Sequence, residues 1–426
     1  MSLVATPTRI QSLDQFRGYS VAGMFVVNFL GGLAVTHQVL KHNNTHFSYA
    51  DSIMPSFIFA CGYSYRMSFL RRLGDIGPAA TRWRFISRSL GLILLSLMVF
   101  GFNDEFKKWS EISLASGFTF IIELLKANMW EVLAIIGACQ ILIMPLVAKS
   151  VRVRIAGFIG LGVLHVLLSW WFNYDFVYGR PNWLDDLLGT SGKRAWDGGF
   201  FGLLAWSQMM LAGTLAYDII QRYASRGAVK QLGLWGIALM LAGYGLSCLT
   251  RLYDLPGGAV EAQGGAAVQA VAATGDEATG AASSLKDSPV IPDWSQAAGR
   301  SWTDLLAEPP FVPPPEAERR AINYWMMDKR LPTPSFVLFS TGCAMALYGL
   351  FVLVCDIGGW TLGLFRTFGQ NPLAAYVIHH FVESAILGVV PKDSPAAWAT
   401  LGMCVAFGIT YMFVRFLEKR GLYLRL

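Results

Sequence analysis

The residues best suited to chemistry lie in one short polar segment. His37, His42 and His46 are three of the six histidines of the chain, and they fall between Asn28 and Asp51. A neutral imidazole can take a proton from an attacking amine or hydroxyl, or act as a nucleophile itself. A solvated loop also tolerates histidines, so the sequence alone leaves both interpretations open. The close spacing of three makes this segment the first candidate for a catalytic site.

Two polar residues that flank the histidines have both structural and functional interpretations. The spacing of Ser48 and Asp51, just before an apolar run, is typical of a capping box that satisfies free N–H groups at a helix start. Asp51 can also orient a histidine or bind a substrate. Asn28 lies near the end of the preceding apolar run. Its amide could donate to the oxyanion of an acyl-transfer intermediate, or bond to a neighbouring helix.

A second polar group occurs near the C-terminus. Asn371 followed by Pro372 is an ordinary helix start. His379 and Glu383 are four residues apart and share a helix face, which predicts a hydrogen-bonded pair directed into a bundle. A metal site formed by the three loop histidines is a weaker alternative, because their spacings match no standard motif. No metal is expected.

The composition indicates which kind of protein holds these residues. The chain has 426 residues, of which 54% are hydrophobic and only 15% charged, and its mean hydropathy is +0.45. Soluble domains carry about 25% charged residues. The predicted fold class is therefore all-α, a polytopic transmembrane helical bundle. The net charge of +6 comes from short loops, so no nucleic-acid partner is expected.

Hydropathy predicts about ten spans, with an eleventh left open. A further apolar stretch at residues 114–125 is short, so it could be re-entrant or lie at the membrane interface. The ten expected spans cover residues 19–35, 50–70, 89–102, 132–148, 155–172, 200–219, 232–252, 336–355, 372–390 and 398–416.

Lysine and arginine in the short loops predict the orientation. They concentrate in the loops after the second, fourth and sixth spans and in the C-terminal tail. Basic loops favour the cytoplasmic side. Both termini are therefore expected in the cytoplasm, and the histidine segment on the extracytoplasmic side.

The same reading divides the chain into three parts. Residues 1–252 would form an N-terminal membrane bundle of seven spans, and residues 334–426 a C-terminal bundle of three. Residues 253–333 would form an extracytoplasmic insertion rich in Ala, Gly and Pro, with a flexible linker at residues 257–284. For the tryptophans of the insertion, interfacial anchoring is favoured over stacking on a sugar: Trp294, Trp302 and Trp325.

The chain resembles the heparan-α-glucosaminide N-acetyltransferase family of the transmembrane acyltransferase superfamily, with a bacterial member expected. The resemblance rests on motifs in the first 70 and last 60 residues. These motifs are Arg9-x-x-Ser12-Leu-Asp14-x-Phe16-Arg17-Gly18, Met24-Phe-Val-Val-Asn28, Lys41-His42, Ala50-Asp51-x-x-x-Pro55-x-Phe57-x-Phe59-x-x-Gly62 and Gly369-x-Asn371-Pro372-Leu373-x-x-Tyr376-Val377-x-His379.

The resemblance implies an enzyme that uses cytosolic acetyl-CoA to acetylate a sugar amine across the membrane. His42 aligns with the essential histidine of the family, Asn28 with its catalytic asparagine, Asp51 with the Asp of its Ala-Asp motif and His379 with its C-terminal histidine. The sequence departs from the family pattern after the histidine, where Asn43-Asn-Thr-His46 stands in place of Trp-Asn-Gly. It departs again at Leu133-Ala-Ile-Ile, in place of Leu-Gln-Arg. The acceptor therefore stays open, and His46 and His37 stay as alternatives to His42.

We therefore expect a transferase that moves an acetyl group from cytoplasmic acetyl-CoA to an amine or hydroxyl of an extracytoplasmic sugar or glycan. A transporter or flippase of a glycoconjugate is the alternative. The expected catalytic residues are His42, Asn28 and Asp51. The expected substrate-binding residues are His46, His379, Asn371 and Glu383. Arg17, Arg66 and Arg71 are expected to bind the phosphates of the donor, from their position and charge.

The expected location is the cell membrane, which would be the inner membrane in a Gram-negative bacterium. The expected partners are acetyl-CoA, the glycan acceptor and the lipid bilayer, and a homodimer is left open. The sequence does not distinguish direct transfer from a route through an acetylated histidine.

Overall fold

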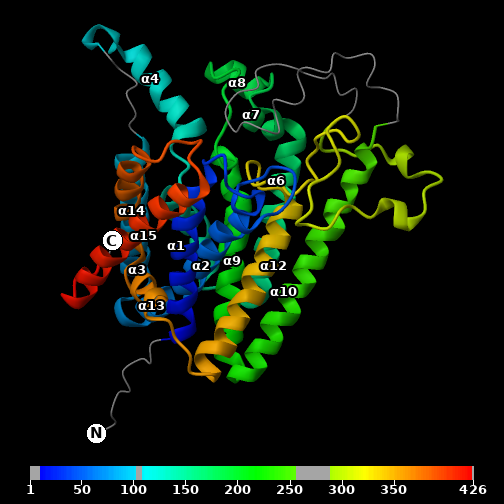
Figure 1. Cartoon of the computed structure of the whole chain (residues 1–426). Coiled ribbons are helices and arrows are strands. Elements are labelled where there is room, and N and C mark those ends of the chain that lie inside the picture. The colour runs from blue at the N-terminus through cyan, green and yellow to red at the C-terminus, as the bar shows by residue number, and fades with distance from the viewer. Residues whose placement is uncertain (1–9, 102–107, 256–287, 425–426) are drawn as a thin grey trace.

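The computed structural model describes residues 10–101, 108–255 and 288–424, and this part of the chain is helical without a named strand. Long helices pack side by side between two ends of a bundle (Figure 1). One end carries the start of the first helix. The other, the histidine-loop end, carries residues 32–48. The predicted linker at residues 257–284 lies outside the described residues. The all-α prediction is confirmed.

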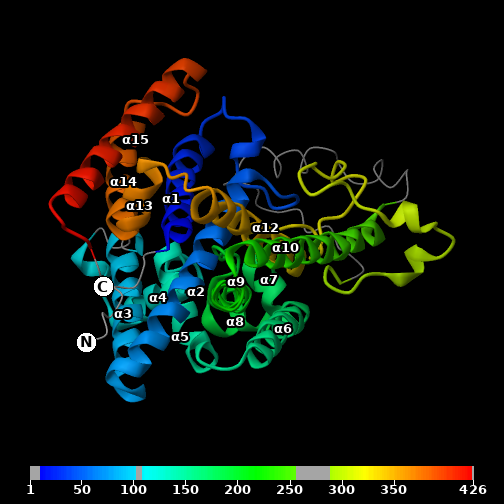
Figure 2. The same cartoon turned by 90° about the horizontal axis from the view of Figure 1, so that it is seen from below.

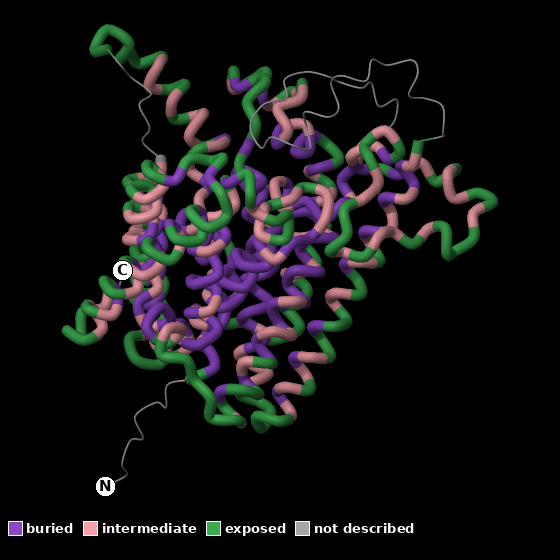
Figure 3. Tube along the Cα trace, viewed as in Figure 1, coloured by how far each residue is buried: buried purple, intermediate pink, exposed green. Residues whose placement is uncertain are grey.

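Four helices form the centre of the bundle. The helix α2 packs against α9, α12 and α1, and Figure 2 shows it between α3 on one side and α9 and α12 on the other. The buried residues concentrate along these helices (Figure 3). Their bounds are Gln11–Gly31 (α1), Tyr49–Ile76 (α2), Gly199–Arg222 (α9) and Pro334–Phe351 (α12).

Helices with apolar, exposed outer faces surround this centre. Such a face is stable against lipid tails, which offer no hydrogen bonds to polar side chains. The surrounding helices are Pro78–Ser96 (α3), Val132–Val147 (α5), Val151–Leu168 (α6), Ser225–Ser247 (α10), Pro372–Leu387 (α14) and Ala396–Lys419 (α15). Shorter helices join them: Leu114–Glu123 (α4), Tyr174–Tyr178 (α7), Trp183–Leu188 (α8) and Gly363–Gln370 (α13).

Within the described residues, six helices are long and apolar enough to cross a membrane. They contain α3, α6, α9, α10, α12 and α15. A seventh span arises if α4 and α5, which are bent by 89° at their junction, count as one. The expected spans in α1, α2 and α14 are helical but are not among them. In α1 and α2 the buried faces carry polar side chains such as Ser12, Asp14, Asp51 and Arg66, and these lower the mean hydropathy. The count of ten spans, the side of each terminus and the three-part division stay predictions.

The stretch at residues 114–125 forms α4 and the start of the π-helical turn Leu124–Asn128. In Figure 1 the helix extends away from the bundle at the histidine-loop end. Leu114, Phe118 and Ile121 are exposed on it.

The π-helical turn Val352–Ile357, with the segment that follows it, joins the start of α1 to the C-terminal third of the chain. At the start of α1, Ser12 donates from its backbone N–H and its hydroxyl to the Asp356 carboxylate, at 3.0 and 2.6 Å. Gln15 exchanges two hydrogen bonds with the backbone of Leu362. A buried helix start leaves N–H groups without partners unless side chains supply them. These contacts therefore seat α1 against the C-terminal third of the chain.

Glycines allow the central helices to touch. A Cβ added at Gly62 of α2 would lie 1.9 Å from the carbonyl oxygen of Met210 in α9, and one added at Gly213 would lie 2.0 Å from that of Phe59. Small residues allow helix backbones to approach closely in membrane bundles. The contact between α2 and α9 therefore requires glycine at both positions.

We predict that Gly213→Ala destabilises the protein by about 1–3 kcal/mol, because the added methyl group forces α9 away from α2. The matched control is Gly233→Ala in α10, where an added Cβ meets nothing within 4 Å. Thermal unfolding in detergent should show a lower midpoint for Gly213→Ala, with the control at or above wild type. Equal midpoints for the two variants would contradict this account of the helix contact.

Candidate functional site

The geometry of the site is set by one hydrogen bond at the histidine-loop end, between His42 and Asp51. His42 Nδ1 lies 2.8 Å from Asp51 Oδ1. A carboxylate can only accept, so Nδ1 carries the hydrogen and Nε2 keeps its lone pair. The His42 side chain is 42% exposed, whereas that of Asp51 is 1% exposed. A buried carboxylate therefore holds an accessible imidazole base in a fixed orientation.

Asp51 is held in place by the start of α2. Ser48 caps this helix by accepting from the Asp51 backbone N–H at 3.2 Å, and Asp51 Oδ2 accepts from the Ser48 backbone N–H, also at 3.2 Å. The same oxygen accepts from the Ser48 hydroxyl at 2.7 Å and from the Asn43 backbone N–H at 3.3 Å. The structure thus contains the predicted capping box. It also brings His42 and Asp51 together.

A second polar pair joins α1 to α14. Asn28 Nδ2 lies 3.5 Å from His379 Nε2, and Glu383 Oε2 lies 3.5 Å from the same nitrogen. His379 Nδ1 is 2.5 Å from the carbonyl oxygen of Tyr376, so Nδ1 carries the hydrogen and Nε2 accepts from the Asn28 amide. Phe25 stacks on the His379 ring with centroids 4.4 Å apart. Asn28, His379 and Glu383 are therefore gathered by the fold, although more than 350 residues separate Asn28 from Glu383.

The other two loop histidines have separate partners. His37 accepts from the backbone N–H of Val39 at 3.3 Å, and His46 pairs with the Thr45 hydroxyl at 3.1 Å. Within the described ranges, no three side chains of His, Cys, Asp or Glu are placed to hold a metal ion. Burial lowers the pKa of His46, with Asp51 acting in the opposite direction.

Asn371, predicted to bind substrate, does not lie near His42. It lies toward the opposite end of the bundle, at the start of α1. Asn371 donates to the carbonyl of Leu422 at 3.0 Å and accepts from the N–H of Leu424 at 3.1 Å, so it secures the C-terminal segment. A Cβ at neighbouring Gly369 would touch Asp14 near the start of α1. About 14 residues of helix, or ~21 Å, separate that level from Asn28.

The three predicted phosphate-binding arginines differ in their surroundings. Arg66 is buried and forms a two-bonded pair with Asp218, at 2.7 and 3.1 Å. A phosphate would therefore compete with a carboxylate for Arg66. Arg71 is exposed and lies 4.0 Å from Asp75. Arg17 has a buried Nε without a hydrogen-bond partner, which is the feature that an anionic ligand would satisfy.

Sequence reasoning missed charged residues supplied by the insertion and by the segment before α9. Lys329 Nζ lies 3.4 Å from Asp197 Oδ1. Asp197 is the one non-glycine residue with a positive φ, 44°, among the described residues, a backbone state that is uncommon and concentrates at functional sites. Asp328 accepts from the Tyr178 hydroxyl and from the Arg330 N–H. The signal in the sequence was the charged triplet at residues 328–330, directly before an apolar span.

We predict that Asp328 makes stability fall as the pH rises toward neutrality. Burial raises the pKa of Asp328 to about 7, whereas an unfolded aspartate titrates near ~4. Between pH ~4 and about 7 the folded state holds a proton that the unfolded state has lost. The free energy of unfolding therefore decreases with pH over this range and is constant at higher pH. Asp328→Asn removes this loss. Its advantage in melting temperature over wild type should grow from pH 5 to 7.

The matched control is Asp304→Asn on the exposed part of the insertion. Hydrogen bonds from Ser301 lower the pKa of Asp304, so this variant should gain nothing between pH 5 and 7. A melting temperature for Asp328→Asn that stays parallel to wild type over this range would refute a protonated, buried Asp328.

Comparison with known proteins bears on the whole arrangement. A family model for the catalytic region of heparan-alpha-glucosaminide N-acetyltransferase matches residues 9–250, more than half of the chain. The match contains Asn28, His42 and Asp51, whereas His379 and Glu383 lie beyond it. A comparison with curated proteins found no match. The chain is a helical membrane protein with an acetyltransferase-type catalytic region, and it belongs to the heparan-alpha-glucosaminide N-acetyltransferase family.

Proposed function

We propose that the protein transfers an acetyl group from cytoplasmic acetyl-CoA to an amine or hydroxyl of an extracytoplasmic sugar or glycan. The observation that carries the proposal is the hydrogen bond between His42 and Asp51. It leaves an exposed imidazole nitrogen with a free lone pair at the end of the bundle, inside the region matched by the acetyltransferase family.

His42 acts as the general base in this proposal. Its Nε2 takes a proton from the acceptor amine or hydroxyl as the nucleophile attacks the thioester carbonyl. The C–S bond then breaks, coenzyme A leaves as the thiolate, and the proton passes to the thiolate. Asp51 keeps Nδ1 protonated and stabilises the imidazolium that forms during the step. The buried capping box holds Asp51 in position for this role.

Asn28 stabilises the oxyanion. Its side chain is exposed at the end of α1, and its amide already donates to His379. A carboxamide has two N–H donors, so one can hold His379 while the other points to the developing negative charge. His379 and Glu383 then act on the position of Asn28.

Donor binding calls for cations at the opposite end of the bundle. Arg17 has an unsatisfied, buried Nε, and Arg71 has a largely exposed side chain. Both can pair with phosphate oxygens of acetyl-CoA without breaking a buried ion pair. Arg66 is the weakest of the three candidates, because Asp218 already occupies its guanidinium.

We predict that His42→Ala lowers kcat for acetyl transfer about 10²–10⁴-fold, as expected for loss of a general base. Binding of labelled acetyl-CoA to the purified protein should be unchanged. His37→Ala is the matched control, since His37 is an exposed histidine of the same loop. An acetyl group found on the His42 peptide after quenching would favour the acetyl-histidine route. Wild-type turnover in His42→Ala would refute the proposed base.

We predict that Asn28→Ala lowers kcat about 10²–10³-fold, the usual loss when one oxyanion donor is removed. The KM for acetyl-CoA should stay near the wild-type value, because the donor phosphates bind elsewhere. His379→Ala should cause a smaller loss, since His379 acts through Asn28. If neither wild type nor variants bind acetyl-CoA, the acetyltransferase proposal fails, and transport of the glycoconjugate becomes the function to assay.

A further inference from the structure

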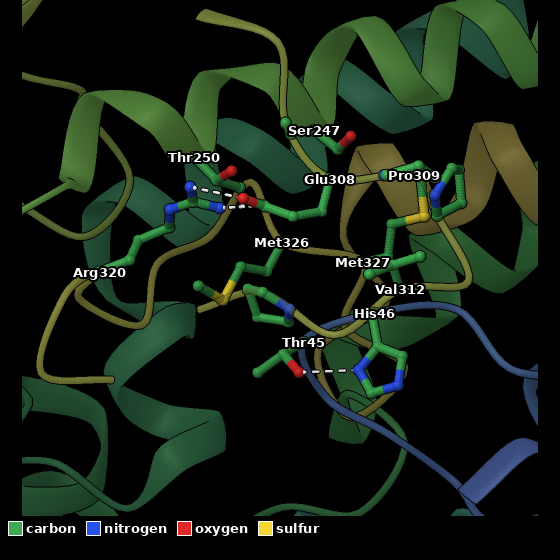
Figure 4. A pocket seen from close by; sticks show the side chains of 13 residues that line it. Thr45, His46, Ser247, Thr250, Glu308, Pro309, Val312, Arg320, Met326 and Met327 are labelled. Carbon is green, nitrogen blue, oxygen red and sulfur yellow. Dashed lines mark hydrogen bonds and ion pairs between the residues drawn. The ribbon is translucent and has the colours of Figure 1, made fainter. Parts of the chain in front are cut away.

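A groove lies between the histidine loop and the insertion, outside the residues assigned to catalysis (Figure 4). The groove is open on one side, and the figure of about 310 Å³ for the space between its atoms includes open solvent. Figure 4 shows Thr45 and His46 on one side and the paired Glu308 and Arg320 on the other. Segments from the histidine loop, the end of α10 and two parts of the insertion thus meet around one hollow.

The groove is connected firmly to the catalytic loop. Phe47 donates its backbone N–H to the carbonyl of Pro310 at 2.8 Å. Its buried ring packs against Phe311 and Phe339, with centroids 5.6 and 4.9 Å away. Phe47 is followed directly by the Ser48 cap that holds Asp51. His46 is four residues from His42, so their Cα atoms are at most about 15 Å apart.

The lining combines an apolar surface with a few polar groups, as small-molecule sites do. Met326, Met327 and Val312 contribute the apolar part together with three prolines. His46 uses Nδ1 for the Thr45 hydroxyl, which leaves its other ring nitrogen for a ligand. Burial lowers the pKa of His46. A neutral imidazole is suited to a ligand hydroxyl, with which it forms an uncharged hydrogen bond.

The charges beside the groove are balanced. Arg320 is 1% exposed, donates to Asp254 at 2.6 Å and forms a two-bonded pair with Glu308 at 2.5 and 3.1 Å. Burial favours the neutral form of Glu308, but the hydrogen bonds and charge of Arg320 outweigh it and lower the pKa of Glu308. Arg251, Arg300 and Arg320 pair with two carboxylates, Asp254 and Glu308. The exposed Asp304 adds a third carboxylate within the electrostatic influence of Arg251 and Arg300.

This balance selects the chemistry of the ligand. A sulfate or phosphate would have to displace a carboxylate from an arginine that is already paired. A polyol without charge can bind His46 and the Thr45 hydroxyl and lay its C–H surface on Val312 and the prolines, which are the more exposed part of the lining. The groove therefore suits an uncharged saccharide unit.

We propose that this groove is an acceptor subsite, which binds an uncharged saccharide unit next to the unit that is acetylated at His42. The inference rests on the proposed function and assigns to the insertion the recognition of a longer acceptor. A monosaccharide would reach the catalytic loop without filling the groove.

The first experiment measures binding without turnover. Diethylpyrocarbonate modifies accessible imidazoles, and mass spectrometry reports the modification rates of His42 and His46 separately in the full chain. We expect a trisaccharide of one terminal glucosamine and two N-acetylglucosamine units to slow modification of His46 about tenfold near saturation. Glucosamine alone should leave His46 unprotected. Modification of His46 at the same rate with and without the trisaccharide would overturn the proposal.

The second experiment fills the groove. Val312 is exposed and lines the groove, so Val312→Trp should block it without disturbing the core. The matched control, Leu306→Trp, replaces an exposed apolar residue of the same segment outside the groove. We expect Val312→Trp to raise KM for the trisaccharide about tenfold and to abolish protection of His46. The KM for glucosamine and for acetyl-CoA should not change. Equal effects on the trisaccharide and on glucosamine would indicate a structural role and refute the subsite.

The design separates failure of the subsite from failure of the proposed function. If the trisaccharide protects His46 of the wild-type protein but no acetyl group is transferred, the groove binds saccharide and the acetyltransferase proposal fails. If transfer occurs without protection, the enzyme proposal stands and the subsite fails. A trisaccharide with O-sulfate groups on its two N-acetylated units tests the charge argument. Protection by the sulfated form alone would overturn an uncharged ligand.

Discussion

The arrangement of the site depends on the buried carboxylate of Asp51. This one group accepts hydrogen bonds from Ser48, from the Asn43 backbone and from His42 Nδ1. A buried carboxylate needs such partners, because an unpaired charge away from water is strongly unfavourable. The requirement that starts α2 thus also fixes the ring orientation of His42. Helix capping and catalytic positioning are satisfied by the same atoms.

The helices at the centre of the membrane bundle bury polar side chains among apolar ones. Apolar helices such as α6 and α10 have exposed outer faces, whereas α1 and α2 bury serines, charged groups and glycines at the centre. Buried polar groups in a bilayer are stabilised by partners within the protein. Ser12 finds its partner in Asp356 and Arg66 in Asp218, whereas Arg17 Nε is left without one. The centre of the bundle can therefore hold a polar site at one end and cationic residues at the other.

Segments far apart in the chain complete the catalytic end. Asn28 from α1 meets His379 from α14, and the insertion reaches back to the histidine loop through Phe47 and Pro310. The family match ends at residue 250, before the insertion and before α14. In the proposed enzyme, the base His42 and its carboxylate Asp51 therefore belong to the matched region, and the insertion recognises the acceptor.

Local patterns in the sequence determined the helical membrane class, the capping box at Ser48 and Asp51, and the shared face of His379 and Glu383, because each depends on residues within one or two helical turns. Hydropathy did not determine the span count, since α1 and α2 bury polar side chains among their apolar ones. Only the tertiary structure decided which histidine pairs with Asp51, that Asn371 holds the C-terminal segment, that Arg66 already has a carboxylate partner, and that the insertion forms a groove with His46. Each of these contacts depends on which helix ends and loops come to lie side by side. Residue spacing along the chain does not carry that information.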